Sequence, residues 1–302
     1  MNYTLHQLRI FTKVCENQSV TKASEELYLT QPAISIQLKK FQNGFEIPLT
    51  EVVGRQLYVT DFGNKIYQLA IDILEKVDLI EAATDEYKGI LTGRLKIEVA
   101  STGKYVIPYF LTGFMRKHPG VTISIDVSNK TKVVENLQSN TLDFALVSVI
   151  PQNLALERIP LMNNELYLVS PEKYLGNQKK ITLRNLHLQT LIFREHGSAT
   201  HNAMTNYLNN YKVQVKRSIE LVSNEAVKQA VIAGLGLSIM PLIGIRSELK
   251  MGKMEIIPIK GLPIITEWNL VYGSGKNLSP AAKALVEYIK LNKITIIEEH
   301  FS

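Results

Sequence analysis

The stretch between Gly63 and Gly89 constrains this chain most, because it contains neither glycine nor proline and its apolar residues keep one helical spacing throughout. Those two residues end helices most readily, so the whole stretch can continue as one helix. At 1.5 Å per residue such a helix would be about 40 Å long. We predict a linker helix at 61–89 that separates a small N-terminal region, 1–60, from a larger C-terminal region, 90–302.

Apolar residues recur along this helix at alternating steps of four and three, which is the spacing of a coiled-coil seam. A seam of this kind pairs two helices, so we expect the chain to form a homodimer through it. The alternative is that the seam packs on the chain's own C-terminal region. The expected dimer contacts are Ile66, Ala70, Ile73, Val77, Ile80 and Tyr87.

The N-terminal region has the pattern of three short helices followed by a hairpin. Apolar residues recur at helical spacing over 5–15, and Ser19 and Thr30 can cap the second and third helices. Pro32 falls in the first turn of the third helix, where proline costs little. A gap of about three residues between these helices is the layout of a helix-turn-helix. The run LTEVVGRQLYVT then alternates around a glycine, which predicts a two-stranded wing.

The C-terminal region alternates between strand-like and helix-like segments. The strand-like segments are RLKIEVA, VTISIDV, LDFALVSV, ELYLVS, TLIF and LSIMP. The helix-like segments are VIPYFLTGFMRK, KVVENLQS, ATHNAMTNYLNN, NEAVKQAVIAG and SPAAKALVEYIK. This alternation predicts a parallel sheet covered by helices, with ligand-binding loops at the carboxyl ends of the strands. We expect two halves, subdomain I at about 90–162 and 267–302 and subdomain II at about 163–266.

Composition excludes several classes of protein. The single cysteine, Cys15, excludes a disulfide scaffold or a thiolate metal cluster and indicates a reducing compartment. We see no secretory signal and no run of about 20 apolar residues, so we expect a cytoplasmic protein without a membrane partner. The net charge is +6, but residues 1–63 hold as many acidic as basic side chains. Bulk charge therefore gives no argument for DNA binding, and local geometry must provide one.

Signatures of catalysis are scarce. His196 and His201 lie five residues apart, but no third metal ligand is near them in the sequence. There is no G-x-S-x-G turn and no phosphate-binding glycine loop. We therefore predict no metal site, no cofactor and no enzymatic activity. We interpret Cys15, on the apolar face of the first helix, as a buried and unreactive thiol.

The N-terminal run LHQLRIFTKVCENQSVTKASEELYLTQPAISIQLKKF resembles the winged helix-turn-helix of LysR-type transcriptional regulators. The likeness continues through GRQLYVTDFG, the linker helix, HPGV, FREHGSATH and GLGLSIMP, and it covers essentially the whole chain. The resemblance implies an all-α winged helix-turn-helix, a dimerising helix, and an α/β effector domain of two Rossmann-like halves, similar to periplasmic solute-binding proteins. The positions that match at fixed offsets are Ser19, Ala23, Leu27, Gln31, Pro32, Ala33, Ser35 and Gln37.

The sequence departs from the family pattern in the wing. Family members usually carry glycine where Glu46 stands, an aromatic–x–arginine where Thr50 and Val52 stand, and glutamate where Gln42 stands. The missing arginine weakens the expected grip of the wing on phosphate and leaves that duty to Arg55.

The C-terminal region resembles the branch that includes regulators of carbon-fixation and of sulfur- or nitrogen-assimilation operons. That branch would carry proline, glycine and arginine where His196, Ala199 and His201 stand. Because the guanidinium is missing at position 201, we do not carry over the usual ligand of the branch.

A recognition helix presents its first turn to the edges of the bases. Gln31 can pair with adenine, Ser35 can bond to either kind of base pair, and Pro32 can contact a thymine methyl group. Basic side chains nearby suit phosphate oxygens. The alternative is simple helix capping for Thr30 and Gln31, and a solvated face for Lys39. The expected DNA contacts are Lys22, Thr30, Gln31, Pro32, Ser35, Lys39 and Arg55.

Small polar residues follow a strand and precede a helix in the segments ASTGK, VSNKT, HGSAT and SNEAV. Hydroxyls and free N–H groups at a helix N-terminus favour an anion, although the same residues are also the preferred N-caps. The family resemblance implies a pocket for a small anionic effector between the two halves. The expected effector contacts are Ser101, Thr102, Ser128, Asn129, Thr131, Ser198, Thr200 and Asn224.

Together these features predict a transcriptional regulator whose binding to double-stranded promoter DNA is modulated by a small metabolite. The expected partners are promoter DNA, the effector and a second copy of the chain, with a tetramer and RNA polymerase as further candidates. One rival is a small-molecule-binding protein whose N-terminal helices serve only assembly, which the neutral charge of residues 1–63 favours. An α/β enzyme is the last alternative.

Overall fold

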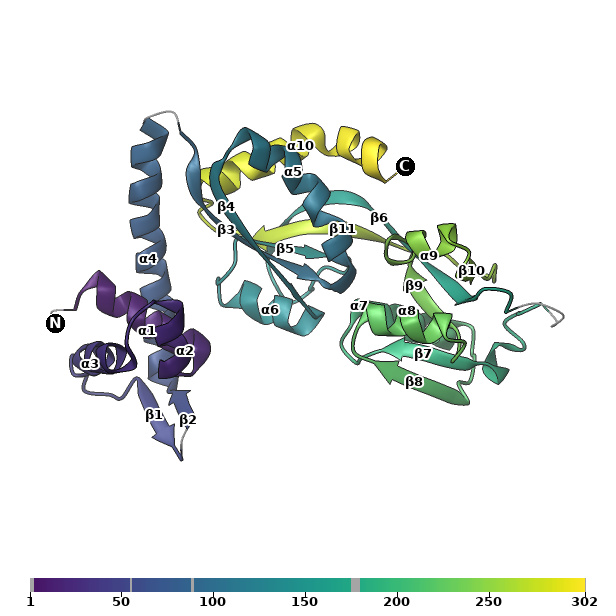
Figure 1. Ribbon diagram of the computed structural model, residues 1–302, viewed down its shortest axis with the longest axis horizontal. Helices are drawn as coiled ribbons and strands as arrows, with labels where there is room; N and C mark the ends of the chain where they lie inside the picture. The colour runs from purple at the N-terminus through teal and green to yellow at the C-terminus, as the bar shows by residue number, and fades with distance from the viewer. Residues whose placement is uncertain (1–2, 55, 88–89, 175–179, 302) are drawn as a thin grey trace. The chain divides into compact units, whose positions relative to one another are not determined.

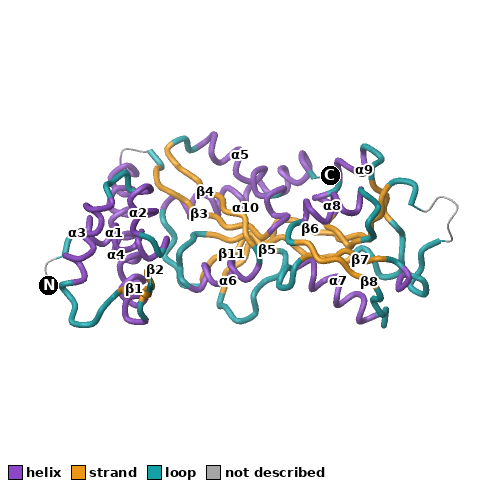
Figure 2. The backbone as a smooth tube through the Cα atoms, turned by 60° about the horizontal axis from the view of Figure 1, so that its bottom comes forward, coloured by secondary structure: helices purple, strands orange, loops and turns teal. Residues whose placement is uncertain are grey.

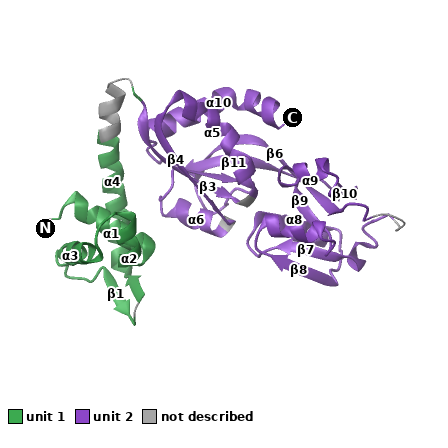
Figure 3. Cartoon of the chain, in the orientation of Figure 1, with its two compact units in different colours: residues 1–90 green, residues 91–302 purple. Residues whose placement is uncertain are grey.

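The computed structural model (Figure 1) describes residues 3–54, 56–87, 90–174 and 180–301, and the side chains of 81–87, 101 and 130 lie outside this description. The chain divides into two compact units, a smaller unit at 1–90 and a larger unit at 91–302 (Figure 3). None of the helices in the described ranges is both long enough and apolar enough to cross a bilayer.

The smaller unit is a helix-turn-helix with a wing and one long helix. Its elements are α1 (Leu5–Asn17), α2 (Val20–Glu26), α3 (Gln31–Gln42), β1 (Thr50–Val53), β2 (Gln56–Val59) and α4 (Asp61–Tyr87). The predicted caps are present: Ser19 accepts a hydrogen bond from the backbone N–H of Lys22, and Thr30 accepts one from that of Ala33. These caps satisfy N–H groups that have no partner inside the helix, so they fix where α2 and α3 begin.

Four helices bury one apolar core in the smaller unit. Phe11 of α1 and Phe41 of α3 lie at its centre, with 5.0 Å between their ring centroids. Gly63, in the first turn of α4, allows that helix to approach the wing, because a Cβ atom there would lie 1.9 Å from the carbonyl oxygen of Leu49. The wing strands pair antiparallel, from Thr50 opposite Val59 onward.

The start of α4 corrects the predicted dimer seam. Ala70 is 1% exposed within this core, and Ile66 is partly buried against the same cluster. Both residues therefore serve the fold of their own unit, because the first turns of α4 pack on it. Two other residues of the predicted seam, Ile73 and Ile80, remain open to solvent, as does the neighbouring Leu69.

The larger unit contains a sheet of seven strands in the order β10–β6–β11–β5–β3–β4, with β9 also paired to β6. The strands are β3 (Thr92–Ala100), β4 (Gly120–Ser128), β5 (Phe144–Val147), β6 (Leu156–Pro171), β9 (Ser238–Pro241), β10 (Met254–Ile256) and β11 (Ile264–Gly273). β3 runs parallel to β4 and β5, whereas β11 runs antiparallel to β5 and β6. Strands form the middle of the unit and helices lie outside them (Figure 2).

The first half of the larger unit is built on β3, β4 and β5. Its helices are η1 (Ser101–Tyr105), α5 (Ile107–Lys117), α6 (Lys130–Gln138) and α10 (Pro280–His300). α5 and α10 pack together in one apolar cluster with Trp268, and α6 packs in another through Val133. The helices therefore cover both faces of the sheet, as the predicted α/β fold requires.

The second half contains a parallel pair, β7 (Thr190–Arg194) and β8 (Arg217–Leu221). Its helices are η2 (Leu186–Leu188), α7 (Ala199–Asn210), α8 (Asn224–Ile232), η3 (Leu242–Gly244) and α9 (Arg246–Lys250). Leu191 bridges to Leu237 just before β9, which ties β7 to the strands of the main sheet. The predicted architecture of two Rossmann-like halves is confirmed.

Two long strands, β6 and β11, join the halves. The beginning of β6 pairs with the end of β11 in the first half, and the end of β6 pairs with β9 and β10 in the second. The pairing of β6 with β11 shifts register between Trp268 and Asn269. The loops of both halves therefore meet beside these two strands.

Candidate functional site

The first candidate site is the outer face of α3. Ile34, Leu38 and Phe41 point into the core, which turns the opposite face of the helix outward. Four of the predicted DNA contacts lie exposed on that outer face, at Gln31, Pro32, Ser35 and Lys39. Their spacing places Gln31, Ser35 and Lys39 one above another along the helix.

The remaining predicted DNA contacts differ in what the structure says of them. Lys22 is exposed on α2, and Thr30 is exposed while its hydroxyl caps α3. Arg55 lies outside the described residues. Sequence reasoning did not single out Tyr28, which is 95% exposed in the turn between α2 and α3 and has a positive φ of 53°.

Two of the positions that depart from the family pattern, Gln42 and Thr50, lie in contact. Gln42, at the end of α3, donates a side-chain hydrogen bond to the hydroxyl of Thr50 at the start of β1. An uncharged pair therefore links the recognition helix to the wing at these two positions. Val52 and Val53 are 68% and 62% exposed, so the described part of this strand presents apolar side chains outward.

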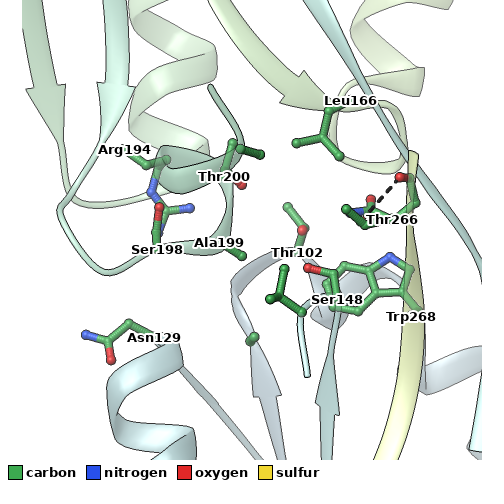
Figure 4. Close-up of a pocket in the computed structure, with 14 residues that line it drawn as sticks. Thr102, Asn129, Ser148, Leu166, Arg194, Ser198, Ala199, Thr200, Thr266 and Trp268 are labelled. Atoms are coloured by element: carbon green, nitrogen blue, oxygen red, sulfur yellow. Dashed lines mark hydrogen bonds between the residues drawn. The ribbon is translucent and has the colours of Figure 1, made fainter. Parts of the chain in front are cut away.

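The second candidate site is a cleft in the larger unit between its two halves (Figure 4). Four of the predicted effector contacts line it: Thr102 and Asn129 from the first half, and Ser198 and Thr200 from the second. Asn129 caps α6 and Ser198 caps α7, so both helices begin at the cleft. The other lining residues are Ala100, Ser148, Val149, Asn164, Leu166, Arg194, Ala199, Ala203, Thr266 and Trp268.

The other predicted effector contacts do not line this cleft. Ser128 donates its hydroxyl to Glu98, a buried carboxylate that also accepts from Asn136. Asn224 is buried in the first turn of α8. Thr131 is exposed near Gly197, where an added Cβ atom would lie 3.3 Å from its hydroxyl oxygen. For Ser101, the side chain lies outside the description. The N-cap pattern thus identified the strand ends correctly but could not say which polar groups face the cleft.

Arg194 is a cleft residue that sequence reasoning missed. It is the last residue of β7, only 5% exposed, and its guanidinium forms two hydrogen bonds with the carboxylate of Glu195, at 2.7 and 2.8 Å. A buried guanidinium carries fixed donors for a carboxylate or phosphate, and here an acidic neighbour offsets its charge.

Two further cleft residues hold buried polar atoms that lack a hydrogen-bond partner among the described residues. These atoms are Nε1 of Trp268 and Oδ1 of Asn164, whose amide nitrogen donates to Thr266 at 3.0 Å. A buried N–H group without an acceptor costs free energy, so such a group at a cleft suits an acceptor on a bound molecule. The indole N–H of Trp268 can therefore donate to an oxygen of a bound anion, whereas Asn164 Oδ1 only accepts and suits a hydroxyl or N–H group of the same molecule.

The second half also brings together a group that the sequence did not suggest. Glu220 of β8 lies beside His196 and His201, and one ligand atom from each of the three lies within 4.8 Å of the others. The sequence prediction discounted the two histidines because no third ligand was near them in the chain. Parallel pairing of β7 and β8 supplies that third group from a segment nineteen residues after His201.

Comparison with known proteins covers both units. Residues 5–64 match the family model described as bacterial regulatory helix-turn-helix protein, lysR family, and residues 88–292 match the LysR substrate binding domain. The RuBisCO operon transcriptional regulator of Allochromatium vinosum is 35% identical over 290 residues, which are 96% of each chain.

Solved structures agree with this assignment. The regulatory domain of CcmR from Synechocystis PCC6803, in complex with 2-PG, is 32% identical and superposes with a TM-score of 0.62 over 67% of this chain and 98% of that one. Full-length CbnR complexed with its target DNA is 21% identical, with a TM-score of 0.66 over 95% of this chain and 99% of that one, a likeness of fold.

Proposed function

The chain belongs to the LysR family of DNA-binding transcriptional regulators with an effector-binding domain, and we propose how its residues perform the two tasks. α3 enters the major groove of promoter DNA, and a small anionic metabolite binds in the cleft between the halves of the larger unit. The role is one of binding and not of catalysis. The single observation that carries the effector proposal is the cleft lined by Arg194, Trp268 and two helix N-termini.

Base readout rests on the first turns of α3. Gln31 offers an amide for bidentate contact with adenine, Pro32 an apolar surface for a thymine methyl group, and Ser35 a hydroxyl for either pair. All three are exposed on the face that turns away from the core. Lys22 and Lys39 flank them and suit phosphate oxygens, which position the helix without reading sequence.

Pairing of two chains sets the spacing of the two recognition helices. The apolar stripe of α4 that remains exposed, Leu69, Ile73 and Ile80, supports a dimer, with Val77 half-buried beside it. Two copies of α3 about one helical turn of DNA apart would read a pseudo-palindromic site. We further propose that two such dimers can associate into a tetramer and that the DNA-bound protein contacts RNA polymerase.

The effector that fits best carries a phosphate or a carboxylate group. The N-termini of α6 and α7, with their N–H groups and partial positive charge, favour such an anion, and the indole N–H of Trp268 offers one more donor. 2-Phosphoglycolate, the ligand of the related CcmR domain, is the first candidate. To change DNA binding, it must bind two arrangements of the protein with different affinity.

The test measures binding of the full chain to DNA of its own upstream intergenic region and to a random duplex, at fixed salt. Gln31→Ala and Ser35→Ala are each expected to weaken binding to the specific duplex by about 1–3 kcal/mol and to leave random binding nearly unchanged. Gln138→Ala, an exposed glutamine of α6, is the matched control. Equal losses on both duplexes would show that these residues do not read bases. If 2-phosphoglycolate leaves binding to the specific duplex unchanged, it is not the effector.

A further inference from the structure

The cluster of His196, His201 and Glu220 lies in the second half of the larger unit, outside the DNA-binding face. His196 precedes α7, His201 lies in its first turn, and Glu220 lies on β8. His196 Nδ1 and a carboxylate oxygen of Glu220 are 3.4 Å apart, and the two imidazole rings have centroids 4.2 Å apart. We propose that these three side chains bind one divalent transition-metal ion, with Zn²⁺ the best fit.

His201 is held in the orientation of a metal ligand. Its ring is buried, 8% exposed, and its Nδ1 lies 2.7 Å from the backbone carbonyl oxygen of Arg194. A carbonyl oxygen only accepts, so Nδ1 carries the proton and Nε2 keeps its lone pair. Histidines that bind metals usually donate their other ring nitrogen in this way, which fixes both the tautomer and the direction of the ring.

The separations between the three ligand atoms are close to those around a tetrahedrally coordinated ion. With bonds of about 2.0–2.1 Å, the ligand atoms around Zn²⁺ lie about 3.3 Å apart. The 3.4 Å between His196 and Glu220 matches this edge, and the widest separation in the cluster, 4.8 Å at most, must contract. The contraction is inexpensive because the side chains of His196 and Glu220 are 86% and 52% exposed and free to turn, while His201 stays fixed.

The ligand set decides the class of metal. Two imidazoles and one carboxylate suit Zn²⁺, Ni²⁺ or Cu²⁺, whereas Mg²⁺ and Ca²⁺ prefer oxygen ligands. Three protein ligands leave a fourth position for water or for an oxygen of another molecule. The competing explanation is a simple ion pair between protonated His196 and Glu220, which needs no metal and no contribution from His201.

The position of the cluster connects it to the cleft. Ser198, Ala199 and Thr200, which line the cleft, lie between His196 and His201 in the chain. A divalent ion held by these two histidines would add positive charge beside the N-terminus of α7. We therefore expect Zn²⁺ to tighten the binding of an anionic effector, and this second step alone rests on the proposed function.

The test titrates Zn²⁺ into the chelator-treated full chain by isothermal calorimetry. The expected result is one site per chain, with at least about tenfold weaker binding in His196→Ala and in Glu220→Gln. Both substitutions are on exposed side chains, so the fold should be retained. His187→Ala, a histidine of η2 outside the cluster, is the control and should bind as the wild type does. Co²⁺ in place of Zn²⁺ should give the intense visible absorption of a four-coordinate ion.

His201→Gln separates the metal site from the ion pair. Loss of the Zn²⁺ site in this variant supports the metal, because the ion pair of His196 with Glu220 does not involve His201. Equal Zn²⁺ affinity in the wild type and in all three cluster variants would overturn the proposal. Zn²⁺ binding that leaves 2-phosphoglycolate affinity unchanged would overturn only the coupling, and 2-phosphoglycolate binding without any Zn²⁺ site would leave the proposed function standing.

Discussion

The position of Cys15 in the fold makes its thiol unreactive. It is 7% exposed on the inner face of α1, and burial, with a smaller effect of the neighbouring Glu16 charge, raises the pKa of its thiol to about 12. The thiolate is the reactive form, and it is scarce at neutral pH when the pKa is this high. The sequence prediction of a buried thiol is confirmed.

Cys15 should therefore react very slowly with a thiol reagent in the folded chain. At pH 8 we expect labelling to be at least about 10³-fold slower than for a free cysteine, because of both the thiolate fraction and the burial. A chromogenic disulfide reagent measures the rate. Unfolding in guanidinium should restore full reactivity, and Cys15→Ala should abolish it. Rapid labelling of the folded chain would contradict the burial of this thiol.

Trp268 offers a residue-scale test of the cleft. Trp268→Phe removes the indole N–H but keeps an aromatic ring in the apolar cluster, so we expect 2-phosphoglycolate to bind about 10- to 150-fold more weakly, as the loss of one hydrogen bond to a charged group implies. Calorimetric titration of the full chain measures this change. Thr122→Val, on an exposed position of β4, is the control. Unchanged affinity would place the effector away from this nitrogen.

Local sequence predicted part of the cleft for a clear reason. Thr102, Asn129, Ser198 and Thr200 each lie close after a strand, and those strand ends meet in an α/β fold. Trp268 could not be found in this way, because Thr266, Glu267 and Asn269 interrupt the apolar pattern of β11. The sequence shows Arg194 as a charged residue after an apolar strand segment. The direction of its side chain depends on the segments of the same chain that pack around β7. Glu220 required the pairing of β7 with β8.

At the scale of elements, α8 and α9 are joined through one buried lysine. Lys228 of α8 lies 2.7 Å from Glu248 of α9 and 2.9 Å from Glu225. Burial lowers the pKa of Lys228, but its hydrogen bonds to Glu248 and Glu225 outweigh this and raise the pKa overall. The lysine therefore stays charged. Because a buried charge without partners is costly, the stability of the fold depends on both acidic partners.

Glu248→Gln should loosen this link. It removes one charge partner and leaves Lys228 with Glu225, whose side chain is 48% exposed, so we expect the free energy of unfolding to fall by about 1–3 kcal/mol. Chemical denaturation followed by the fluorescence of Trp268, the single tryptophan, measures the change in the larger unit. Glu287→Gln, a substitution of the same kind on α10, is the control. Equal stability of the two variants would contradict the role of the pair.

Element boundaries were predicted best where caps and turns define them. α3 begins after Thr30 and α7 after Ser198, as the capping residues indicated. α10 continues to His300, ten residues beyond the predicted segment, because Ile296 and the capping residue Phe301 still pack on the core. β6 was predicted only over 165–170 and β11 not at all, since strands that pass from one half to the other change their surroundings midway and lose a simple pattern.

At the scale of the whole molecule, the exposed stripe of α4 is the feature that calls for a second chain. Leu69, Ile73 and Ile80 are 57%, 38% and 68% exposed, whereas Ala70 is buried within its own unit. The heptad spacing predicted a seam but not its rotation around the helix axis. That rotation is set by which side of α4 packs on the smaller unit, and a sequence pattern of 3.5 residues per turn cannot choose between adjacent sides.

Charges on this stripe should separate the dimer. Ile73→Asp with Ile80→Asp would place two carboxylates in the apolar seam, so we expect the mass measured by light scattering to fall towards that of one chain. Asp78→Arg, on the opposite side of the same helix, is the control and should leave the mass unchanged. A double variant that keeps the wild-type mass would show that α4 does not pair two chains through this side.

The two strands shared by both halves restrict how the larger unit can deform. Ladder pairing from Ile264 with Leu166 to Gly273 with Leu156, interrupted by one register shift, opposes sliding of these strands, so we expect closure of the cleft to proceed by twisting of the two strands. Their most compliant point is the irregularity at Trp268 and Asn269, where the ladder slips by one residue. Trp268 thus lines the cleft and also lies at the register shift. We therefore expect a substitution there to change effector binding and the rotation of the two halves together.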